Sequence, residues 1–246
     1  MTESESNARA GRQHARRRVP GWLILLVGVG LTAAVFPFDA RIHAWATSIK
    51  LGGDVRRELE AWQQFGGLVS VLVVAVLVWR LDGARVARLL DLAVAAVGTS
   101  LVILALKMLI GRPRPKFDDP GIVLGPFGSY PLGVDGSGRG IHHAWEFWAG
   151  ISSDLWSMPS SHTSGAVALG VFLARMYPRI SGLAWGLVGV VACARVLRDA
   201  HWPSDVVLGA TVGLVVSRAA IDGMWGSRWT GKGAGRTATL AAQPER

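Results

Sequence analysis

Apolar residues dominate six stretches of the chain, which are separated by shorter polar segments. The stretches cover residues 21–37, 66–79, 89–110, 163–177, 182–197 and 206–221. Each approaches the ~20 apolar residues that a helix needs to cross a bilayer core, although the second and fourth must borrow flanking residues. The runs are continuous and lack the alternation of a membrane β-barrel strand. The pattern therefore predicts an all-α fold, a polytopic membrane helical bundle with about six transmembrane helices.

Composition agrees with a membrane protein. Of the 246 residues, 50% are hydrophobic and only 17% are charged, and the mean hydropathy is +0.35. Soluble domains rarely reach this balance. We expect a basic N-terminal tail at 1–20, one membrane domain at 21–224 and a basic C-terminal tail at 225–246. The single cysteine, Cys193, lies inside an apolar run, so we expect a small buried hydrophobe and no disulfide framework.

The net charge of +9 would suggest a nucleic-acid partner in a soluble protein, but here much of the basic surplus flanks apolar runs. The segment RQHARRRVP directly precedes the first run, where arginines hold a helix end in the cytoplasm and contact anionic headgroups. A polyanion-binding tail is the alternative. A cleaved secretory signal has the same order of basic and apolar residues, but this run is longer and less sharply ended than most. We expect a retained first span and no nucleic acid partner.

Basic residues between the spans predict which end of the bundle faces the cytoplasm. If the arginine-rich N-terminus is inside, the linker at 80–88, the turn at 175–179 and the C-terminal tail are also inside, as the positive-inside rule requires. The predicted outer segment at 39–60 is an exception, because it contains Arg41, Lys50, Arg56 and Arg57 as well as acidic residues that suit an amphipathic surface helix. We expect a multi-pass protein of the cell (inner) membrane.

A long segment at 111–161, rich in glycine, proline and tryptophan, joins the third and fourth stretches. Connections of this length are usually functional or disordered. Its HHAWEFWAG part is interpreted as an interfacial anchor, a cover over a substrate groove or a plain surface loop. His142 and His143 suggest a metal, but no carboxylate or cysteine at ligand spacing is recognised beside them, so we expect no metal.

Unusual polar residues stand where the apolar runs begin or end. Lys107 and Arg114 follow the third run, and His162 begins the fourth. Arg195 lies near the end of the fifth run, and His201 and Asp205 begin the sixth. The ends of odd spans and the starts of even spans lie on the same membrane face. Because polar residues are costly at such junctions, the sequence predicts a functional site at the outer face.

The types of these residues indicate phosphoryl chemistry. Guanidinium and ammonium groups are the donors that a phosphate needs, and they stabilise its charge during transfer. In MPSSHTSGA, Ser160 is a candidate N-cap, and free N–H groups at a helix start bind anions. In HWPSD, Asp205 stands four residues after His201 and is expected to reach back to its ring. A carboxylate bound to one ring nitrogen fixes the tautomer and leaves a free lone pair on the other nitrogen. His201 is therefore a candidate nucleophile.

The chain resembles the type 2 phosphatidic acid phosphatase superfamily, which has a three-part signature. The first part, Lys, six residues and Arg-Pro, is present in KMLIGRPRP as Lys107 and Arg114; the earlier Arg112-Pro113 pair has too short a spacing. The second, usually Pro-Ser-Gly-His, is present as PSSH with Ser161 in place of glycine. The third, Ser-Arg, five residues, His, three residues and Asp, has Ala194 in place of serine.

The resemblance implies a role for each matching residue. It implies that His201 attacks phosphorus to form a phosphohistidine, that Asp205 orients His201, and that His162 protonates the leaving oxygen and later activates water. Five residues would hold the phosphate, namely Lys107, Arg114, Ser160, Ser161 and Arg195. The resemblance also implies six spans, an extracytoplasmic active site and no metal or other cofactor.

The leading hypothesis is a phosphatase for a lipid phosphate or diphosphate, such as a polyprenyl diphosphate, phosphatidylglycerol phosphate, phosphatidate or a phosphorylated glycolipid. A lipid phosphotransferase using the same pocket is the second hypothesis. A catalytically silent lipid-binding or transport protein is the third, and the presence of His162, His201 and Asp205 argues against it. The superfamily also includes vanadium haloperoxidases, which are as a rule larger and soluble. The sequence leaves the particular lipid and the oligomeric state open.

Overall fold

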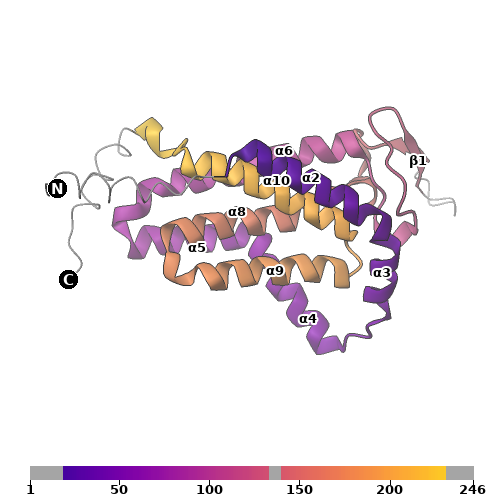
Figure 1. The fold of residues 1–246 in the computed structure, drawn as a ribbon, viewed down its shortest axis with the longest axis horizontal. Coiled ribbons are helices and arrows are strands. Elements are labelled where there is room, and N and C mark those ends of the chain that lie inside the picture. The colour runs from indigo at the N-terminus through magenta and orange to yellow at the C-terminus, as the bar shows by residue number, and fades with distance from the viewer. Residues whose placement is uncertain (1–18, 133–139, 231–246) are drawn as a thin grey trace, which may run out of the picture.

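The computed structural model describes residues 19–132 and 140–230. The predicted N-terminal tail, most of the C-terminal tail and part of the 111–161 segment lie outside the described residues. In the described part, the six apolar stretches correspond to six long helices, which Figure 1 shows running along the long axis of the molecule. They are α2 (Gly21–Val35), α5 (Leu68–Leu81), α6 (Leu89–Ile110), α8 (Ser161–Met176), α9 (Ser181–Leu197) and α10 (Pro203–Asp222). The predicted all-α membrane bundle is confirmed.

Not all six helices are long enough to cross a bilayer alone. Among the described residues, four helical segments are sufficiently long and apolar, namely Gly21–Ser48, Gly83–Ile110, Pro178–Leu197 and Pro203–Trp229. A fifth span is formed if Gly53–Gly66 and Leu68–Leu81, which are bent by 61° relative to each other, act together. The remaining helix, α8, has 16 residues and rises about 24 Å. The fourth apolar stretch of the sequence, 163–177, is also too short to cross a bilayer without flanking residues.

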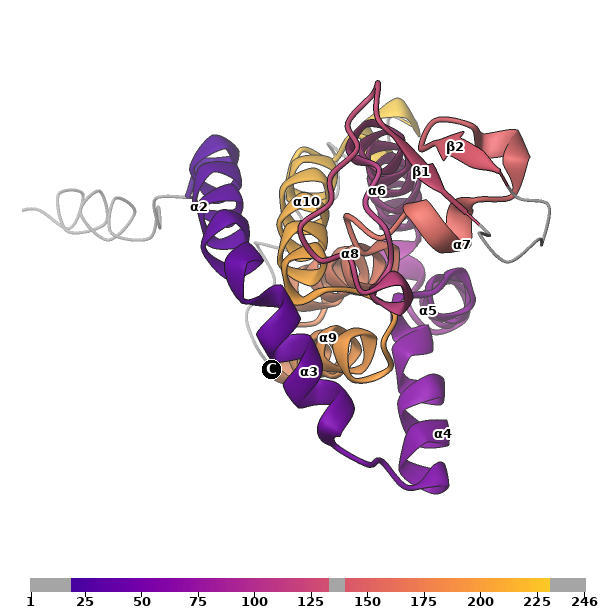
Figure 2. The ribbon, with the colours of Figure 1, turned by 90° about the vertical axis from the view of Figure 1, so that its right-hand side faces the viewer.

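The chain between α2 and α5 folds over the end of the bundle that faces the viewer in Figure 2. It contains η1 (Phe36–Phe38), α3 (Asp39–Ser48), α4 (Gly53–Trp62) and η2 (Gln63–Gly66), so two helices stand where one surface helix was expected. The bend after α4 requires glycine, because a Cβ on Gly66 would lie 2.0 Å from the carbonyl oxygen of His162. This close approach holds η2 against the start of α8.

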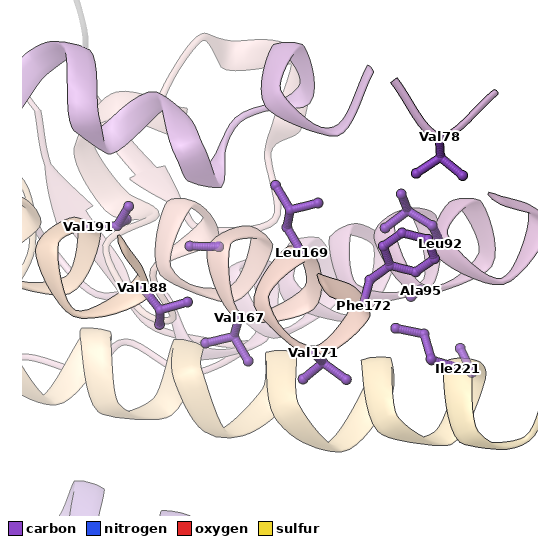
Figure 3. Close-up of a cluster of buried hydrophobic side chains, with 12 residues drawn as sticks. Val78, Leu92, Ala95, Val167, Leu169, Val171, Phe172, Val188, Val191 and Ile221 are labelled. Carbon is purple, nitrogen blue, oxygen red and sulfur yellow. The ribbon is translucent and has the colours of Figure 1, made fainter. Parts of the chain in front are cut away.

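The largest apolar core surrounds α8. Figure 3 shows Leu169 and Phe172 of α8 among side chains of neighbouring helices, including Leu92 and Ile221. Glycines on α10 let its backbone approach α8 closely, because a Cβ on Gly209 would lie 2.5 Å from the carbonyl oxygen of Ser160. Small residues are the usual means of close helix packing in membranes. The contact fixes the first turn of α8 beside the first turns of α10.

The 111–161 segment has structure of its own. It contains η4 (Pro115–Phe117), η5 (Phe147–Ala149), α7 (Ser152–Leu155) and an antiparallel pair of short strands, β1 (Ser129–Pro131) and β2 (Ile141–His143). A second apolar cluster, formed around Tyr130 and Leu155, supports it. The exposed fraction of Trp148 in the HHAWEFWAG part is 65%, which leaves the anchor, cover and surface-loop interpretations open.

The remaining short helices are η3 (Gly83–Arg88), η6 (Pro178–Ile180) and η7 (Ser227–Thr230), which lie at the end of the bundle opposite α3. The prediction that Cys193 is buried is wrong, because Cys193 is exposed on α9. An apolar residue of a membrane span can be satisfied by lipid as well as by protein, so an apolar run does not distinguish the two surroundings.

Candidate active site

The predicted site residues come from the ends of four helices that meet at one end of the bundle. Lys107 is in the last turn of α6, His162 in the first turn of α8, Arg195 in the last turn of α9 and Asp205 in the first turn of α10. Hydrogen bonds join these helix ends. The Ser160 N–H donates to the Asp205 carbonyl oxygen at 3.0 Å, and the His201 N–H donates to that of Arg195 at 3.1 Å.

Lys107, Arg114 and Arg195 lie close together, and only some of their N–H groups have hydrogen-bond partners among the described residues. Lys107 donates to the carbonyl oxygen of Trp156. Nη1 of Arg114 donates weakly to the Ala200 carbonyl oxygen, at 3.4 Å, and Nη1 of Arg195 donates to Oε1 of Gln63 at 2.6 Å. The Nε atoms of Arg114 and Arg195 are buried without a hydrogen-bond partner among the described residues. Buried unpaired donors are costly, and a bound anion would remove that cost.

Electrostatics also favours an anion here. Burial lowers the pKa of the Arg114 guanidinium, and the carboxylates of Asp205 and Asp154 offset this effect only in part. Lys107, Arg114 and Arg195 all lie close enough to His162 for their charges to act on its ring. Three cations around one imidazole repel one another unless negative charge is bound between them. The arrangement therefore fits a phosphate group.

A cavity of about 460 Å³ opens beside these cations. Lys107, Arg114, Ser161 and Trp156 line it, and it continues between α6 and α8 as far as Ser100. Neither His162 nor His201 is among its lining residues, and His201 has an exposed fraction of only 2%. The structure thus places Lys107, Arg114 and Ser161 at the cavity, whereas Arg195 and the two histidines do not line it.

Asp205 lies next to His201, as the spacing predicted, but the two side chains are not hydrogen bonded. Oδ2 of Asp205 is 3.6 Å from Nδ1 of His201, and this nitrogen has no partner among the described residues. Oδ2 instead accepts hydrogen bonds from Oγ of Ser157 at 2.5 Å and from the Trp202 N–H at 2.9 Å. A small shift of the ring would close the contact, and hydrogen bonds of active sites often shorten only with substrate bound.

Ser160 occupies the predicted N-cap position of α8, but its hydroxyl does not cap the helix. The hydroxyl accepts a hydrogen bond from Oγ1 of Thr163 at 3.0 Å, so the predicted side-chain cap is absent. The first N–H groups of an α-helix have no partner inside the helix. Those of Ser161 and His162 therefore remain suited to an anion, and Ser161 lines the cavity.

Sequence reasoning missed the residue that holds Asp205. Nη1 of Arg112 donates to Oδ1 of Asp205 and to Oγ of Ser204, and Nη2 donates to Oδ2 of Asp39, each at 2.7 Å. All three charged side chains are fully buried. The only sequence signal for Arg112 was the Arg112-Pro113 pair. That pair did not match the signature, because its spacing from Lys107 is too short. Nothing in the sequence connects Asp39 to residues 73 positions away.

Comparison with known proteins identifies the family. A family model described as the PAP2 superfamily matches residues 88–229, which is more than half of the chain. The chain belongs to the PAP2 superfamily. A search of curated proteins finds no significant match.

Two solved structures share the PAP2 fold of this chain. The structure of the first transmembrane PAP2 type phosphatidylglycerolphosphate phosphatase from Bacillus subtilis matches with a TM-score of 0.57 and 20% identity, covering 83% of this chain and 94% of that one. Aquifex aeolicus LpxE matches with a TM-score of 0.56 and 14% identity, covering 75% of this chain and 95% of that one. At these identities the likeness shows the fold.

Two site contacts come from outside the region that matches the PAP2 model. Asp39 and Gln63 precede residue 88, and they contact Arg112 and Arg195, respectively. The N-terminal part of this chain therefore supports the PAP2 site directly. Neither residue has a local sequence signature, because each acts only through a long-range contact.

The two loop histidines of this PAP2 protein have partners that the sequence analysis did not recognise. Nδ1 of His142 is 2.7 Å from Oε2 of Glu146, and Oε1 of Glu146 accepts the His143 N–H at 2.9 Å. The statement that no carboxylate stands beside these histidines is wrong. Nδ1 of His143 is 2.9 Å from the carbonyl oxygen of Gly128. In 19–132 and 140–230, no three His, Cys, Asp or Glu residues are grouped to hold a metal.

His201 is expected to make folding sensitive to acid. Burial lowers the pKa of its imidazole to about 3, helped by the charges of Lys107 and Arg195 and opposed by Asp205. In an unfolded chain histidine titrates at about 6.5. The unfolded state therefore binds more protons between these values, so stability is present above about pH 6.5 and is lost as the pH falls toward 3. At neutral pH the ring is uncharged and able to act as a nucleophile.

We expect His201→Gln to lose less stability than the wild type between about pH 7 and about pH 4, because glutamine cannot be protonated in this range. Tryptophan fluorescence during thermal unfolding in detergent would measure the midpoint at each pH. His142→Gln serves as the control, since its ring is partly exposed and paired with Glu146. Equal pH slopes for wild type and His201→Gln would contradict the titration assigned to His201.

Proposed function

We propose that this protein is a phosphatase that hydrolyses a lipid phosphate or diphosphate through a phosphohistidine intermediate. The observation that carries the proposal is that Lys107, Arg114 and Arg195 meet beside the buried neutral ring of His201. Two of their guanidinium N–H groups have no hydrogen-bond partner in the part of the chain that the structure describes. Such a set of cations can bind phosphate and stabilise the charge on its equatorial oxygens during transfer. Membership of the PAP2 superfamily supports the same reaction class.

The first chemical step forms the phosphoenzyme. The three cations, Ser160 and the N–H of Ser161 hold the phosphate oxygens. The negative charge of the bound phosphate favours the protonated form of His162. Nε2 of His201 attacks phosphorus while the bond to the lipid oxygen breaks, and protonated His162 gives a proton to the leaving oxygen and becomes neutral. The phosphorylated ring keeps its proton on Nδ1 and is positively charged. Asp205, 3.6 Å away, stabilises that charge.

The second step returns the enzyme to its starting state. Neutral His162 takes a proton from water, the water oxygen attacks phosphorus, and the bond between phosphorus and Nε2 breaks. Inorganic phosphate leaves, and His201 is neutral again. The mechanism uses the fixed charges of this chain and requires no metal or other cofactor.

Two features support a lipid substrate handled at the extracytoplasmic face. The cavity beside Lys107 continues between α6 and α8 to Ser100, two turns deeper in the bundle, where the hydrophobic part of a lipid would lie. The basic 80–88 and 175–179 segments lie at the opposite end of the bundle, although the 39–60 segment at the site end also contains arginine and lysine. Positive charge favours the cytoplasmic side, so this polarity directs the candidate site outward.

Phosphate release by purified protein in detergent tests the proposal. The substrate panel contains phosphatidate, phosphatidylglycerol phosphate, a polyprenyl diphosphate and a phosphorylated glycolipid, each measured with a chelator present. We expect release from at least one lipid, independent of the chelator and strongly reduced in His201→Ala and His162→Ala. Equal release by wild type and variants would refute the mechanism. Loss of activity with the chelator would instead indicate a metal, with His142 and His143 as the first residues to test.

A further inference from the structure

An apolar groove lies on a different side of the bundle from the cavity between α6 and α8. It has a volume of about 620 Å³ and is lined by α2, α9 and α10, with Val27, Val188 and Ala210 as examples. Figure 2 shows α2 and α9 on two sides of α10. On α2 the lining residues extend from Leu23 to Leu31, which corresponds to about 12 Å along a helix axis, and Val19 before the helix also lines the groove. The groove has almost no polar lining and is long enough to hold part of an acyl chain.

The groove leads to a basic mouth. A second cavity of about 280 Å³ shares Trp185 and Leu214 with the groove and is also lined by Arg175 and Arg218. Arg175 is in the last turn of α8, and Arg218 is one turn before the end of α10. Both positions are at the end of the bundle opposite His201. The mouth therefore belongs to the other membrane leaflet.

Among the described residues that line or pair at the mouth, the arginines outnumber the carboxylates by one. Asp222 is the carboxylate between the two arginines, with Oδ1 2.9 Å from Nε of Arg175 and Oδ2 3.8 Å from Nε of Arg218. Nη2 of Arg218 also donates to the Val19 carbonyl oxygen at 3.3 Å. Two guanidinium groups and one carboxylate give a net charge of +1, and both arginine side chains are partly exposed, at 44% and 22%.

We propose that the groove and its mouth bind one anionic phospholipid. An acyl chain lies along α2 and α10, and the phosphodiester contacts Arg175 and Arg218. A phosphodiester carries a single negative charge, which balances the net charge of the mouth, and guanidinium groups bind phosphate oxygens well. Basic pockets between membrane helices are suited to anionic headgroups. A zwitterionic lipid would place its own cation beside the two arginines.

The proposal is independent of the phosphatase reaction, because the basic mouth and the candidate active site lie at opposite ends of α8 and α10. Bound lipid would add contacts that join α2 to α9 across the groove. We therefore expect the lipid to stabilise the bundle. No chemical change of the lipid is involved.

Native mass spectrometry of the purified protein would test binding. Phosphatidylglycerol and phosphatidylcholine with identical chains are offered together, with inorganic phosphate in excess to occupy the candidate active site. We expect a preference for phosphatidylglycerol of about fivefold, the factor associated with one cationic side chain near a headgroup. Arg218→Gln should remove most of the preference while leaving the Arg175–Asp222 pair intact.

Two further variants separate a defined site from general attraction to the membrane. Arg179→Gln removes a nearby charge that does not line either cavity, so it should keep the preference. Ala210→Phe fills the groove and should lower the binding of both lipids. Equal binding of the two lipids by wild type, or equal loss in Arg179→Gln and Arg218→Gln, would overturn the proposal. If Arg218→Gln does not fold, Ala210→Phe with intact arginines still decides the question.

Discussion

Alanine in place of His201 is expected to reduce phosphate release by about 10⁴-fold or more, the scale seen when a covalent nucleophile is removed. The ring is buried and neutral at physiological pH, and alanine puts no nucleophile in its place. Water would have to attack phosphorus directly, with help only from the cations. Initial rates of phosphate release from the best lipid of the panel measure the effect. Unfolding midpoints would show that the variant is folded.

His162→Ala provides the matched control, because it separates formation of the phosphoenzyme from its breakdown. With an aryl phosphate, whose leaving group needs no proton, His162→Ala should still phosphorylate His201 but hydrolyse the intermediate slowly. An acid-labile, alkali-stable phosphate on the protein would then accumulate, and it should be absent from the double variant with His201→Ala. If the trapped phosphate is acid-stable, or remains in the double variant, His201 is not the nucleophile.

The spans were predictable from sequence because a bilayer imposes one strong requirement. Each backbone polar group must be satisfied inside its own segment, so a continuous apolar run has few alternatives to a helix. An apolar run does not specify which of its residues face protein and which face lipid. Cys193 was misplaced for that reason. The lengths of α2 and α6 matched their runs, whereas α8 is shorter than a span and depends on the helices packed around it.

The site was predictable where residues lie at helix ends, and unpredictable where they act through distant partners. Alternation of spans across the membrane was sufficient to place Lys107, His162 and His201 at one end. Ser157 and Asp39 contact this site from a loop and from α3, and no local pattern reveals such contacts. The departure at Ser161 is accommodated, since its side chain faces the cavity rather than a packed helix.

Replacement of Arg112 by methionine is expected to cost about 3–5 kcal/mol of folding stability, the range for breaking a buried ion pair by removing one partner. The change would leave two fully buried carboxylates, Asp39 and Asp205, without their shared cation. Thermal and denaturant unfolding in detergent would measure it. Arg57→Met is the control, because its pair with Asp54 is exposed and such pairs contribute about 0–1 kcal/mol. Equal destabilisation by the two substitutions would contradict the network.

A positioning role for Arg112 makes a second, separable prediction about turnover. Arg112 does not line the cavity, whereas Arg114 does, so Arg112→Lys should lower kcat with little change in KM. Lysine keeps the charge between Asp39 and Asp205 but cannot donate to Asp39, Asp205 and Ser204 with the same fork. Arg114→Lys should instead raise KM, because that side chain would hold the phosphate itself. If Arg112→Lys raises KM as much as Arg114→Lys does, Arg112 binds substrate. Substrate binding would then break the contact between Arg112 and Asp205.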